Sequence, residues 1–301
     1  MKFIRPRLLA CLAATLLSGS AALAQGYTFE VVASGLSRPT GIAAHGSGKI
    51  YFSEIPTPGM AGGLNAVKEL KLGNGATRVI HQGEPEPVNI AVDKSGVLYW
   101  TCKSAGVILE QAPHRPASTA MPLLTGLAKP SGIAIDENGK VYFTQLPTPG
   151  VGGGSGGTNT VNSVSTENHH SVHVISSGEP EPTDIAASGD GELYWTCKSA
   201  NVILTRDVDG NIKPLLTGLN QPVGIALDEK RQLLFWTEVP TPGVAGTAGG
   251  SNKVWSYNLR TAAKTLVHAG DPEPTDITVT PNGRLYWTCS SAGVIVEARR
   301  I

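Results

Sequence analysis

The sequence has no excess of charge of either sign, few cysteines and no long apolar run after its first residues. Its 24 lysines and arginines balance 24 aspartates and glutamates, so the basic surface typical of nucleic-acid-binding proteins is not expected. Beyond the N-terminal segment, no run is apolar over the roughly 20 residues that a membrane-spanning helix needs. We therefore expect no nucleic-acid partner and no membrane span.

The N-terminal segment has the pattern of an export signal. Three basic residues precede a short apolar run, which ends in the small-residue cleavage pattern Ala22-Leu23-Ala24. This predicts a signal peptide at residues 1–24 and one domain at residues 25–301, exported to the periplasm or the extracellular medium and expected to act as a monomer. After cleavage, 21 basic residues remain against 24 acidic residues, a net charge of −3 with histidine neutral.

Internal repetition dominates the rest of the chain. A segment beginning GLSRPTGIAA at Gly35 recurs in related form at Gly126 and Gly218. Between these copies, EPEPVNIA, EPEPTDIA and DPEPTDIT begin at Glu84, Glu179 and Asp271, and each is followed by LYWTC. The two alternating types give six units of about 45 residues, the period of four-stranded propeller blades.

Each unit is predicted to contain four short strands. Alternating, β-branched and aromatic residues separated by glycine-containing turns favour strands over helices. In the first unit these strands are expected at 40–44, 49–54, 65–72 and 76–82. Residues 27–36 resemble a fourth strand and residues 292–301 a third, so the two ends can complete one blade and close a ring. An open solenoid of about twelve hairpins is the alternative, but it would need capping repeats.

The blade sequences resemble known propeller repeats. PSGIAIDENGKVYFT, from Pro130, resembles an NHL blade, and GVLYWTC, from Gly96, resembles the YWTD blade of receptor propellers with cysteine in place of aspartate. From Tyr27 to Ile301 the layout is similar to six-bladed propellers of the gluconolactonase and virginiamycin B lyase type. The resemblance implies an all-β, six-bladed β-propeller with pseudo-threefold alternation. It does not decide function, because this fold hosts hydrolases, lyases, receptors and scaffolds.

The acidic turns are expected to lie on the face where propellers of this type bind ligands. The candidate ligand-binding acids are Glu84, Glu86, Glu179, Glu181, Asp271 and Glu273. Proline fixes its own φ and disfavours helical geometry in the preceding residue, so we expect that residue to be extended and its carboxylate to be held in place.

Three oxygen-bearing side chains of the inner strands are expected to converge near the propeller axis. Asn89, Asp184 and Asp276 occupy equivalent positions where the other three units have glycine. Hard oxygen ligands in a ring suit Ca²⁺ or another divalent cation such as Mg²⁺. Alternatively, these side chains cap backbone N–H groups at the strand entry, and the acidic turns are solvated.

The resemblance implies a related metal site but matches it imperfectly. In the gluconolactonase family a glutamate, together with asparagine and aspartate in short pre-strand segments, holds the metal. Asn89 and Asp184 fall one position later than that pattern. The family's catalytic roles are therefore not assigned to this chain.

Two other repeated features have both a functional and a structural interpretation. Glycine-rich segments follow each PTPG and could form a lid over the channel, or they could be flexible linkers. Cys102, Cys197 and Cys289 end the second strands of alternate blades, too far apart for a shared zinc ion or a disulfide. We expect buried thiols between blades, while Lys103 and Lys198 could instead lower a thiol pKa and create a nucleophile.

Two functions are consistent with these patterns. The first is a non-enzymatic binding protein whose acidic channel face takes a cation, a small-molecule or cationic ligand, or a protein partner. The alternative is a metal-dependent lactonase, esterase or lyase, with the ion at Asn89, Asp184 and Asp276 and with Glu54 or Glu238 as the catalytic base. The threefold repetition and the lack of a readable acid–base constellation favour binding.

Overall fold

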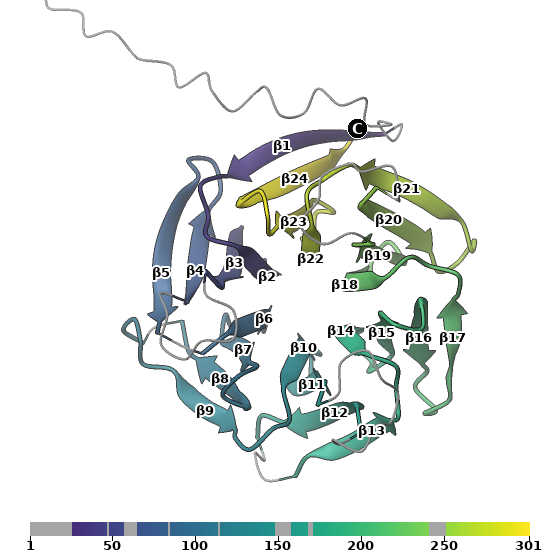
Figure 1. Ribbon diagram of the computed structural model, residues 1–301, viewed down its shortest axis with the longest axis horizontal. Coiled ribbons are helices and arrows are strands. Elements are labelled where there is room, and N and C mark those ends of the chain that lie inside the picture. The colour runs from purple at the N-terminus through teal and green to yellow at the C-terminus, as the bar shows by residue number, and fades with distance from the viewer. Residues whose placement is uncertain are drawn as a thin grey trace, which may run out of the picture.

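The computed structural model describes residues 26–46, 48–56, 65–83, 85–113, 115–147, 158–167, 171–240 and 251–301. The described residues form 24 β-strands in six four-stranded antiparallel sheets, arranged as blades around a central axis (Figure 1). This confirms the all-β, six-bladed β-propeller. No helix long and apolar enough to cross a membrane is found in this part of the chain.

Each blade runs outward from an inner strand beside the axis. The inner strands of blades 1 to 6 are β2 (Pro39–His45), β6 (Pro87–Val92), β10 (Pro130–Ile135), β14 (Pro182–Ala187), β18 (Pro222–Asp228) and β22 (Pro274–Val279). The second strands are β3 (Lys49–Glu54), β7 (Leu98–Cys102), β11 (Lys140–Gln145), β15 (Leu193–Cys197), β19 (Leu233–Glu238) and β23 (Leu285–Cys289).

The outer half of each blade completes the sheet. The third strands are β4 (Ala66–Lys71), β8 (Val107–Gln111), β12 (Thr160–Ser165), β16 (Val202–Arg206), β20 (Lys253–Asn258) and β24 (Val294–Arg300). The fourth strands are β5 (Ala76–Gln82), β9 (Met121–Leu124), β13 (His173–Ser177), β17 (Ile212–Leu216), β21 (Lys264–Ala269) and, for blade 6, β1 (Tyr27–Ala33).

The ring closes through the pairing of β1 with β24. The two strands are antiparallel, with Tyr27 opposite Arg300 and Val31 opposite Val296. The N-terminal strand therefore supplies the fourth strand of blade 6 (Figure 1), as the repeat pattern predicted. This closed arrangement excludes the open solenoid.

The hydrophobic core lies between neighbouring blades. Trp100, Trp195 and Trp287, the tryptophans of the three LYWTC segments, are completely buried. Trp287 packs in one cluster with Phe235 and Val254 of blade 5. The interpretation of these tryptophans as inter-blade core is confirmed, and each aromatic side chain removes a large apolar area from water.

In every blade, a serine or threonine hydroxyl of the second strand forms a hydrogen bond with the same position of the inner strand. It accepts a hydrogen bond of 2.9–3.2 Å from the backbone N–H of the inner strand's third residue. The six hydroxyls belong to Ser53, Thr101, Thr144, Thr196, Thr237 and Thr288. In the even-numbered blades the threonine also donates to a carbonyl of the next blade's inner strand at 2.6–2.7 Å, which joins neighbouring blades.

The residue before each inner-strand proline has a left-handed backbone conformation. The φ angle lies between 51° and 57° at Arg38, Glu86, Lys129, Glu181, Gln221 and Glu273. The expectation of extended geometry was therefore wrong at Glu86, Glu181 and Glu273. The conformation aims the residue's carbonyl at the end of the second strand, where Glu86, for example, accepts the N–H of Lys103 at 3.0 Å. This hydrogen bond offsets part of the strain of a non-glycine residue at positive φ.

Glycine at the third position of each odd inner strand allows a close backbone approach to the next blade. A Cβ at Gly41, Gly132 or Gly224 would lie 2.5–2.6 Å from the Cα of Asn89, Asp184 or Asp276, respectively. The alternation of glycine with a polar residue is thus a packing requirement at the axis.

Replacing Gly132 with alanine is expected to lower the free energy of unfolding by about 3 kcal/mol, because two strand backbones must move apart. Gly46→Ala is the matched control, since a Cβ there meets nothing within 4 Å. Denaturant unfolding of both variants measures the difference. Equal stabilities would contradict the close packing at the axis.

Candidate functional site

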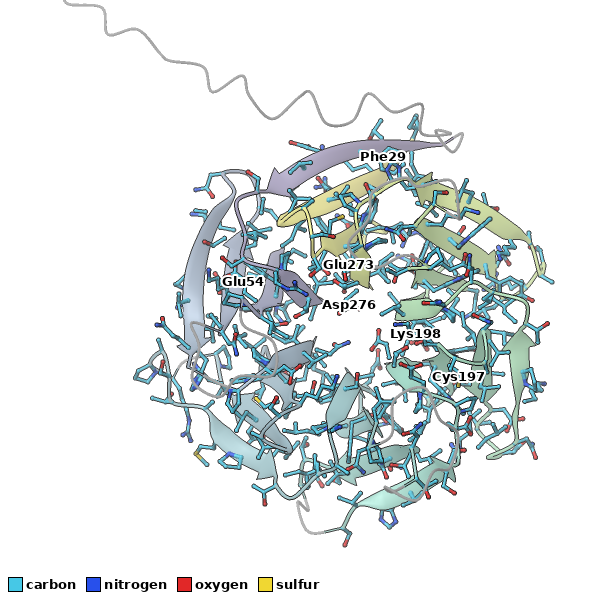
Figure 2. The ribbon with its side chains drawn as sticks, viewed as in Figure 1. Phe29, Glu54, Cys197, Lys198, Glu273 and Asp276 are labelled. Atoms are coloured by element: carbon cyan, nitrogen blue, oxygen red, sulfur yellow. The ribbon has the colours of Figure 1, made fainter. Side chains whose placement is uncertain are left out.

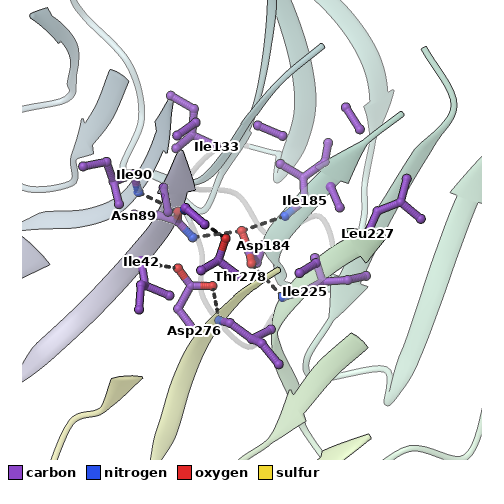
Figure 3. Close-up of a pocket in the computed structure, with 18 of the residues that line it drawn as sticks. Ile42, Asn89, Ile90, Ile133, Asp184, Ile185, Ile225, Leu227, Asp276 and Thr278 are labelled. Carbon is purple, nitrogen blue, oxygen red and sulfur yellow. Dashed lines mark hydrogen bonds between the residues drawn. The ribbon is translucent and has the colours of Figure 1, made fainter. Parts of the chain in front are cut away.

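The three predicted inner-strand residues meet at the propeller axis. Asn89, Asp184 and Asp276 are the third residues of β6, β14 and β22, and their side chains converge in the close-up of Figure 3. The amide nitrogen Nδ2 of Asn89 donates to Oδ1 of Asp184 at 2.9 Å. The carboxyl groups of Asp184 and Asp276 also lie close enough to shift each other's pKa. Alternate blades thus bring their polar side chains together.

The two aspartates also cap backbone N–H groups, as the structural interpretation predicted. Asp184 accepts the N–H of Ile185 and, across the blade boundary, the N–H of Ile225, both at 2.8 Å. Asp276 accepts the N–H of Ile277 at 2.7 Å and, likewise across a boundary, the N–H of Ile42 at 2.8 Å. Each carboxyl group therefore joins two blades as well as facing the axis.

Burial makes both carboxyl groups hard to ionise. Asp184 and Asp276 are 4% and 5% exposed. Desolvation raises the pKa of Asp184 to about 7, although hydrogen bonds from Ile225, Ile185, Asp276 and Asn89 oppose the shift. Desolvation, and then the nearby charge of Asp184, raise the pKa of Asp276 well above its ordinary range. We infer that the pair holds at least one proton at neutral pH and that this proton resides on Asp276.

A cavity of about 170 Å³ extends along the axis from these residues. The three polar side chains line it together with apolar residues of all six inner strands, as far as strand-end residues such as Val92 and Val279. No described residue in the lining is a lysine, arginine or histidine. The carboxyl pair therefore has no compensating cationic side chain in the cavity.

The donor set at the axis is incomplete for a dehydrated metal ion. Ca²⁺ takes six to eight oxygen ligands, whereas only two carboxyl groups meet here. Asn89 presents its nitrogen to Asp184, and its oxygen accepts the N–H of Ile90 at 2.6 Å. Within the described ranges, no group of three or more histidine, cysteine or acidic side chains could hold a metal. Asp184 and Asp276 could hold a cation that keeps its waters or carries its own donors.

The first acid of the acidic turn contacts both blades that the turn connects. Asp271 is buried, and its carboxylate accepts from Nε1 of Trp287 at 2.7 Å and lies 3.2 Å from Nε2 of His268. Glu179 accepts from the hydroxyl of Ser176 and from Sγ of Cys197. In the sequence, these partners stand three positions before the acids, Ser176 before Glu179 and His268 before Asp271. This pairing was not predicted from the sequence. Glu84 lies outside the described residues.

The second acid of each turn is half-buried. Glu86 accepts a hydrogen bond from Ser104, and Glu273 accepts from Ser291 at 2.9 Å. Glu181 accepts the N–H of Lys198 at 3.0 Å through its backbone carbonyl. Figure 2 shows Glu273 beside the central opening, near Asp276. None of these three acids lines the axial cavity.

The two candidate bases have partners away from the axis. Glu54 forms an ion pair with Lys68 at 2.6 Å, inside blade 1 (Figure 2). Glu238 accepts from the indole nitrogens of Trp236 and Trp255 at 3.3 and 2.9 Å. Both glutamates are buried and neither lines the axial cavity. The structure does not bring either of them to Asp184 and Asp276.

The three cysteines are completely buried and form no disulfide. Burial, and secondarily Glu179, raises the pKa of Cys197; burial and Asp271 raise that of Cys289. A raised pKa makes a thiol a poorer nucleophile. The interpretation of buried packing thiols is confirmed. The glycine-rich segments after PTPG and residues 1–24 lie outside the described part of the chain.

Comparison with known proteins supports the fold. No protein-family model matches the chain. It is 26% identical over 278 residues to the low-density lipoprotein receptor-related protein 1 of Pyricularia oryzae (strain 70-15), covering 80% of this chain and 85% of that protein. A streptogramin B lyase structure is similar with a TM-score of 0.61 and 19% identity, over 92% of this chain and 98% of the lyase.

A second solved structure gives the same result. A putative gluconolactonase has a TM-score of 0.67 and 12% identity, over 92% of this chain and 93% of that chain. The class of protein is therefore a six-bladed β-propeller with lyase-, gluconolactonase- and receptor-type neighbours. At these identities the structural likeness establishes the fold and leaves the activity open.

Proposed function

We propose that the protein is an exported, non-enzymatic binding propeller whose axial site takes a small cation, either a hydrated metal ion or the ammonium group of a small molecule. The observation that supports this most strongly is the pair of buried carboxyl groups that line the axial cavity. Buried acids without a cationic partner are expensive when ionised. A bound cation would compensate their charge and displace the shared proton.

The surroundings favour binding over catalysis. The axial cavity holds no second acid–base group beyond the aspartate pair, because its remaining described lining is Asn89, Thr278 and apolar side chains. Half-buried Glu86, Glu181 and Glu273 each precede an inner-strand proline, and their negative charge would attract cations to that face of the ring. The leader-like N-terminal segment supports export.

A cation should raise the melting temperature more at pH 8 than at pH 5. At pH 8 binding has to displace fewer protons, because Asp184 is ionised. With CaCl₂ or methylammonium chloride at a hundred times the Kd, the expected rise is roughly 5 °C. Differential scanning calorimetry at matched ionic strength measures it. Comparing the rise in melting temperature with calcium and with methylammonium shows whether the site prefers a metal ion or an ammonium group.

Two variants control this experiment. Asp276→Asn should abolish most of the rise, whereas Asp190→Asn removes an exposed carboxylate and should leave it unchanged. If neither cation shifts the wild-type melting temperature at pH 8, the binding proposal is wrong.

The enzymatic alternative rests on the fold of the lyase and gluconolactonase neighbours alone. A screen of lactone and ester hydrolysis with the wild type and Asp184→Asn tests it. Activity lost in the variant would favour the metal-dependent enzyme over the binding protein. Activity equal in both would exclude the axial aspartates as its site.

A further inference from the structure

A second, larger cavity lies between blades 5 and 6, where the ring closes. It has a volume of about 430 Å³. Four arginines line it, Arg231, Arg284, Arg299 and Arg300, beside the phenol of Tyr27 and the amide of Asn282. Leu233 and Phe235 provide an apolar part of the wall. Among the described lining residues, Asp228 has the one acidic side chain.

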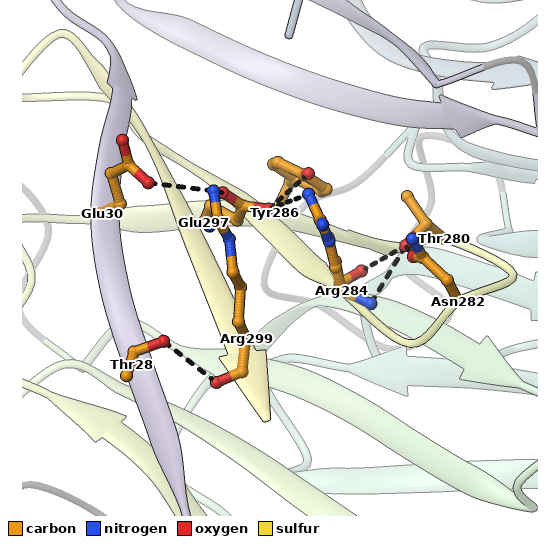
Figure 4. Close-up of polar contacts among 8 residues, drawn as sticks. All are labelled: Thr28, Glu30, Thr280, Asn282, Arg284, Tyr286, Glu297 and Arg299. Atoms are coloured by element: carbon orange, nitrogen blue, oxygen red, sulfur yellow. Dashed lines mark hydrogen bonds and ion pairs between the residues drawn. The ribbon is translucent and has the colours of Figure 1, made fainter. Parts of the chain in front are cut away.

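Each ion pair of these arginines uses only one terminal nitrogen of the guanidinium group. Arg231 contacts Asp228 through one nitrogen at 2.8 Å. Arg284 contacts buried Glu297 at 3.2 Å, and Arg299 contacts the same carboxylate at 2.6 Å (Figure 4). The same nitrogens of Arg231 and Arg299 also contact the carbonyl of Pro281 and the carboxylate of Glu30, respectively. A guanidinium group carries five N–H donors, so, among the described residues, each of the three arginines has donors beyond the one nitrogen used in these contacts.

Other groups at this cavity can also donate. The hydroxyl of Thr280 donates to Oδ1 of Asn282 at 2.5 Å, which leaves the amide nitrogen of Asn282 as a donor (Figure 4). The pKa of Tyr27 is raised, first by burial, while the charges of Arg300 and Asp228 act in opposite directions. The phenol therefore stays protonated close to both charged side chains. Arg300 is exposed.

The positive charge is specific to this position in the ring. Where blade 6 has Arg284, the equivalent residues of blades 2 and 4 are Val97 and Glu192. Where it has Arg299, they are Ala112 and Asp207. The threefold repeat therefore does not require these arginines. Closure of the ring explains the pair between Arg299 and Glu30, but it does not explain the others.

We propose that this cavity binds an oxyanion group, a phosphate or a carboxylate, carried on an apolar or aromatic body. Arginine matches both anions through paired N–H donors. The apolar wall explains why the cavity is larger than a bare anion needs. This site is separate from the axial one and does not depend on cation binding there.

Isothermal titration with phenyl phosphate, benzoate and inorganic phosphate at pH 8 and low salt tests the proposal. We expect one of the two aromatic anions to bind, and to bind more tightly than inorganic phosphate; their order identifies the preferred anion. Arg300→Gln should weaken binding about tenfold, the value of one charge-assisted hydrogen bond. Arg231→Gln should do the same. Comparing melting temperatures confirms that both variants are folded.

Arg260→Gln is the matched control, because it removes an exposed arginine of blade 5 that does not line the cavity. It should change affinity less than twofold. If Arg260→Gln weakens binding as much as Arg300→Gln does, the loss of affinity reflects the change in net charge alone, and the proposal is overturned. Failure of both aromatic anions to bind at millimolar concentration would also overturn it. Asp276→Asn should bind these anions with the affinity of the wild type. The test of this cavity is therefore independent of whether the axial site binds a cation.

Discussion

Asn89→Asp is expected to destabilise the protein strongly at pH 8 and only slightly at pH 5. The change places a third carboxyl group beside Asp184 and Asp276, where Asn89 now donates a hydrogen bond. An uncompensated buried charge costs about 3–5 kcal/mol, which corresponds to a melting temperature roughly 10 °C lower. At pH 5 the added group can remain protonated. Thermal unfolding at both pH values measures the effect.

The same variant is also expected to bind calcium more tightly than the wild type, because a third carboxylate adds oxygen ligands. Calcium at pH 8 should therefore restore much of the lost melting temperature. The control is Asn74→Asp, an exposed position where the new side chain can still accept the N–H of Ala76. An Asn89→Asp protein that melts within about 2 °C of the wild type at pH 8 would contradict the convergence at the axis.

Asp276→Asn is expected to gain stability relative to the wild type as the pH rises from 5 to 8. The folded-state pKa of Asp276 lies well above its ordinary value of 3.8. In this pH range the folded wild type therefore keeps a proton that the unfolded chain has lost, and its stability falls with pH. Removing this group should therefore gain stability relative to the wild type at up to about 1.4 kcal/mol per pH unit, for as long as the folded wild type keeps the proton.

Asparagine at position 276 can keep the hydrogen bond from the next residue, as Asn89 does with Ile90. It loses the oxygen that accepts the N–H of Ile42, a cost that is the same at every pH and leaves the pH-dependent gain in place. Urea unfolding at several pH values gives the free energies. Asp184→Asn serves as the comparison, because its relative gain should stop near pH 7, the folded-state pKa of Asp184. Parallel stability curves for wild type and Asp276→Asn would show that Asp276 is ionised at neutral pH.

The fold could be predicted from the sequence because six related units of about 45 residues follow one another in the chain. The strands expected at 49–54 and 76–82 are observed as β3 and β5 with the same bounds. The convergence of Asn89, Asp184 and Asp276 followed from their shared place on inner strands, since closing the ring brings equivalent residues to the axis. Local pattern and topology were sufficient for both.

The details of the acidic turns could not be predicted in this way. Proline normally disfavours helical geometry in the residue before it, but at Glu181 a backbone hydrogen bond from Lys198 accompanies a positive φ. Asp271 was expected at a ligand-binding rim, yet it contacts His268 and Trp287. Such contacts depend on how the fourth and second strands pack, which a periodic pattern does not specify.

The candidate bases lie apart from the axial cavity for a related reason. Glu54 and Glu238 occupy the same position in blades 1 and 5, but their partners differ, because Lys68 stands beside one and Trp255 beside the other. Repetition of a carboxylate therefore did not indicate a repeated role. The inner-strand acids differ in this respect, since Asp184 and Asp276 both accept two backbone N–H groups at the axis.

The most direct measurement is a ¹³C NMR titration of the aspartate carboxyl carbons, with Asp184→Asn and Asp276→Asn used for assignment. We predict one carboxyl group that titrates near pH 7, assigned to Asp184, and a second, Asp276, whose pKa also lies well above the ordinary aspartate range. If every aspartate ionises below about pH 5, the ordinary range for this side chain, then the two acids do not share a buried site at the axis.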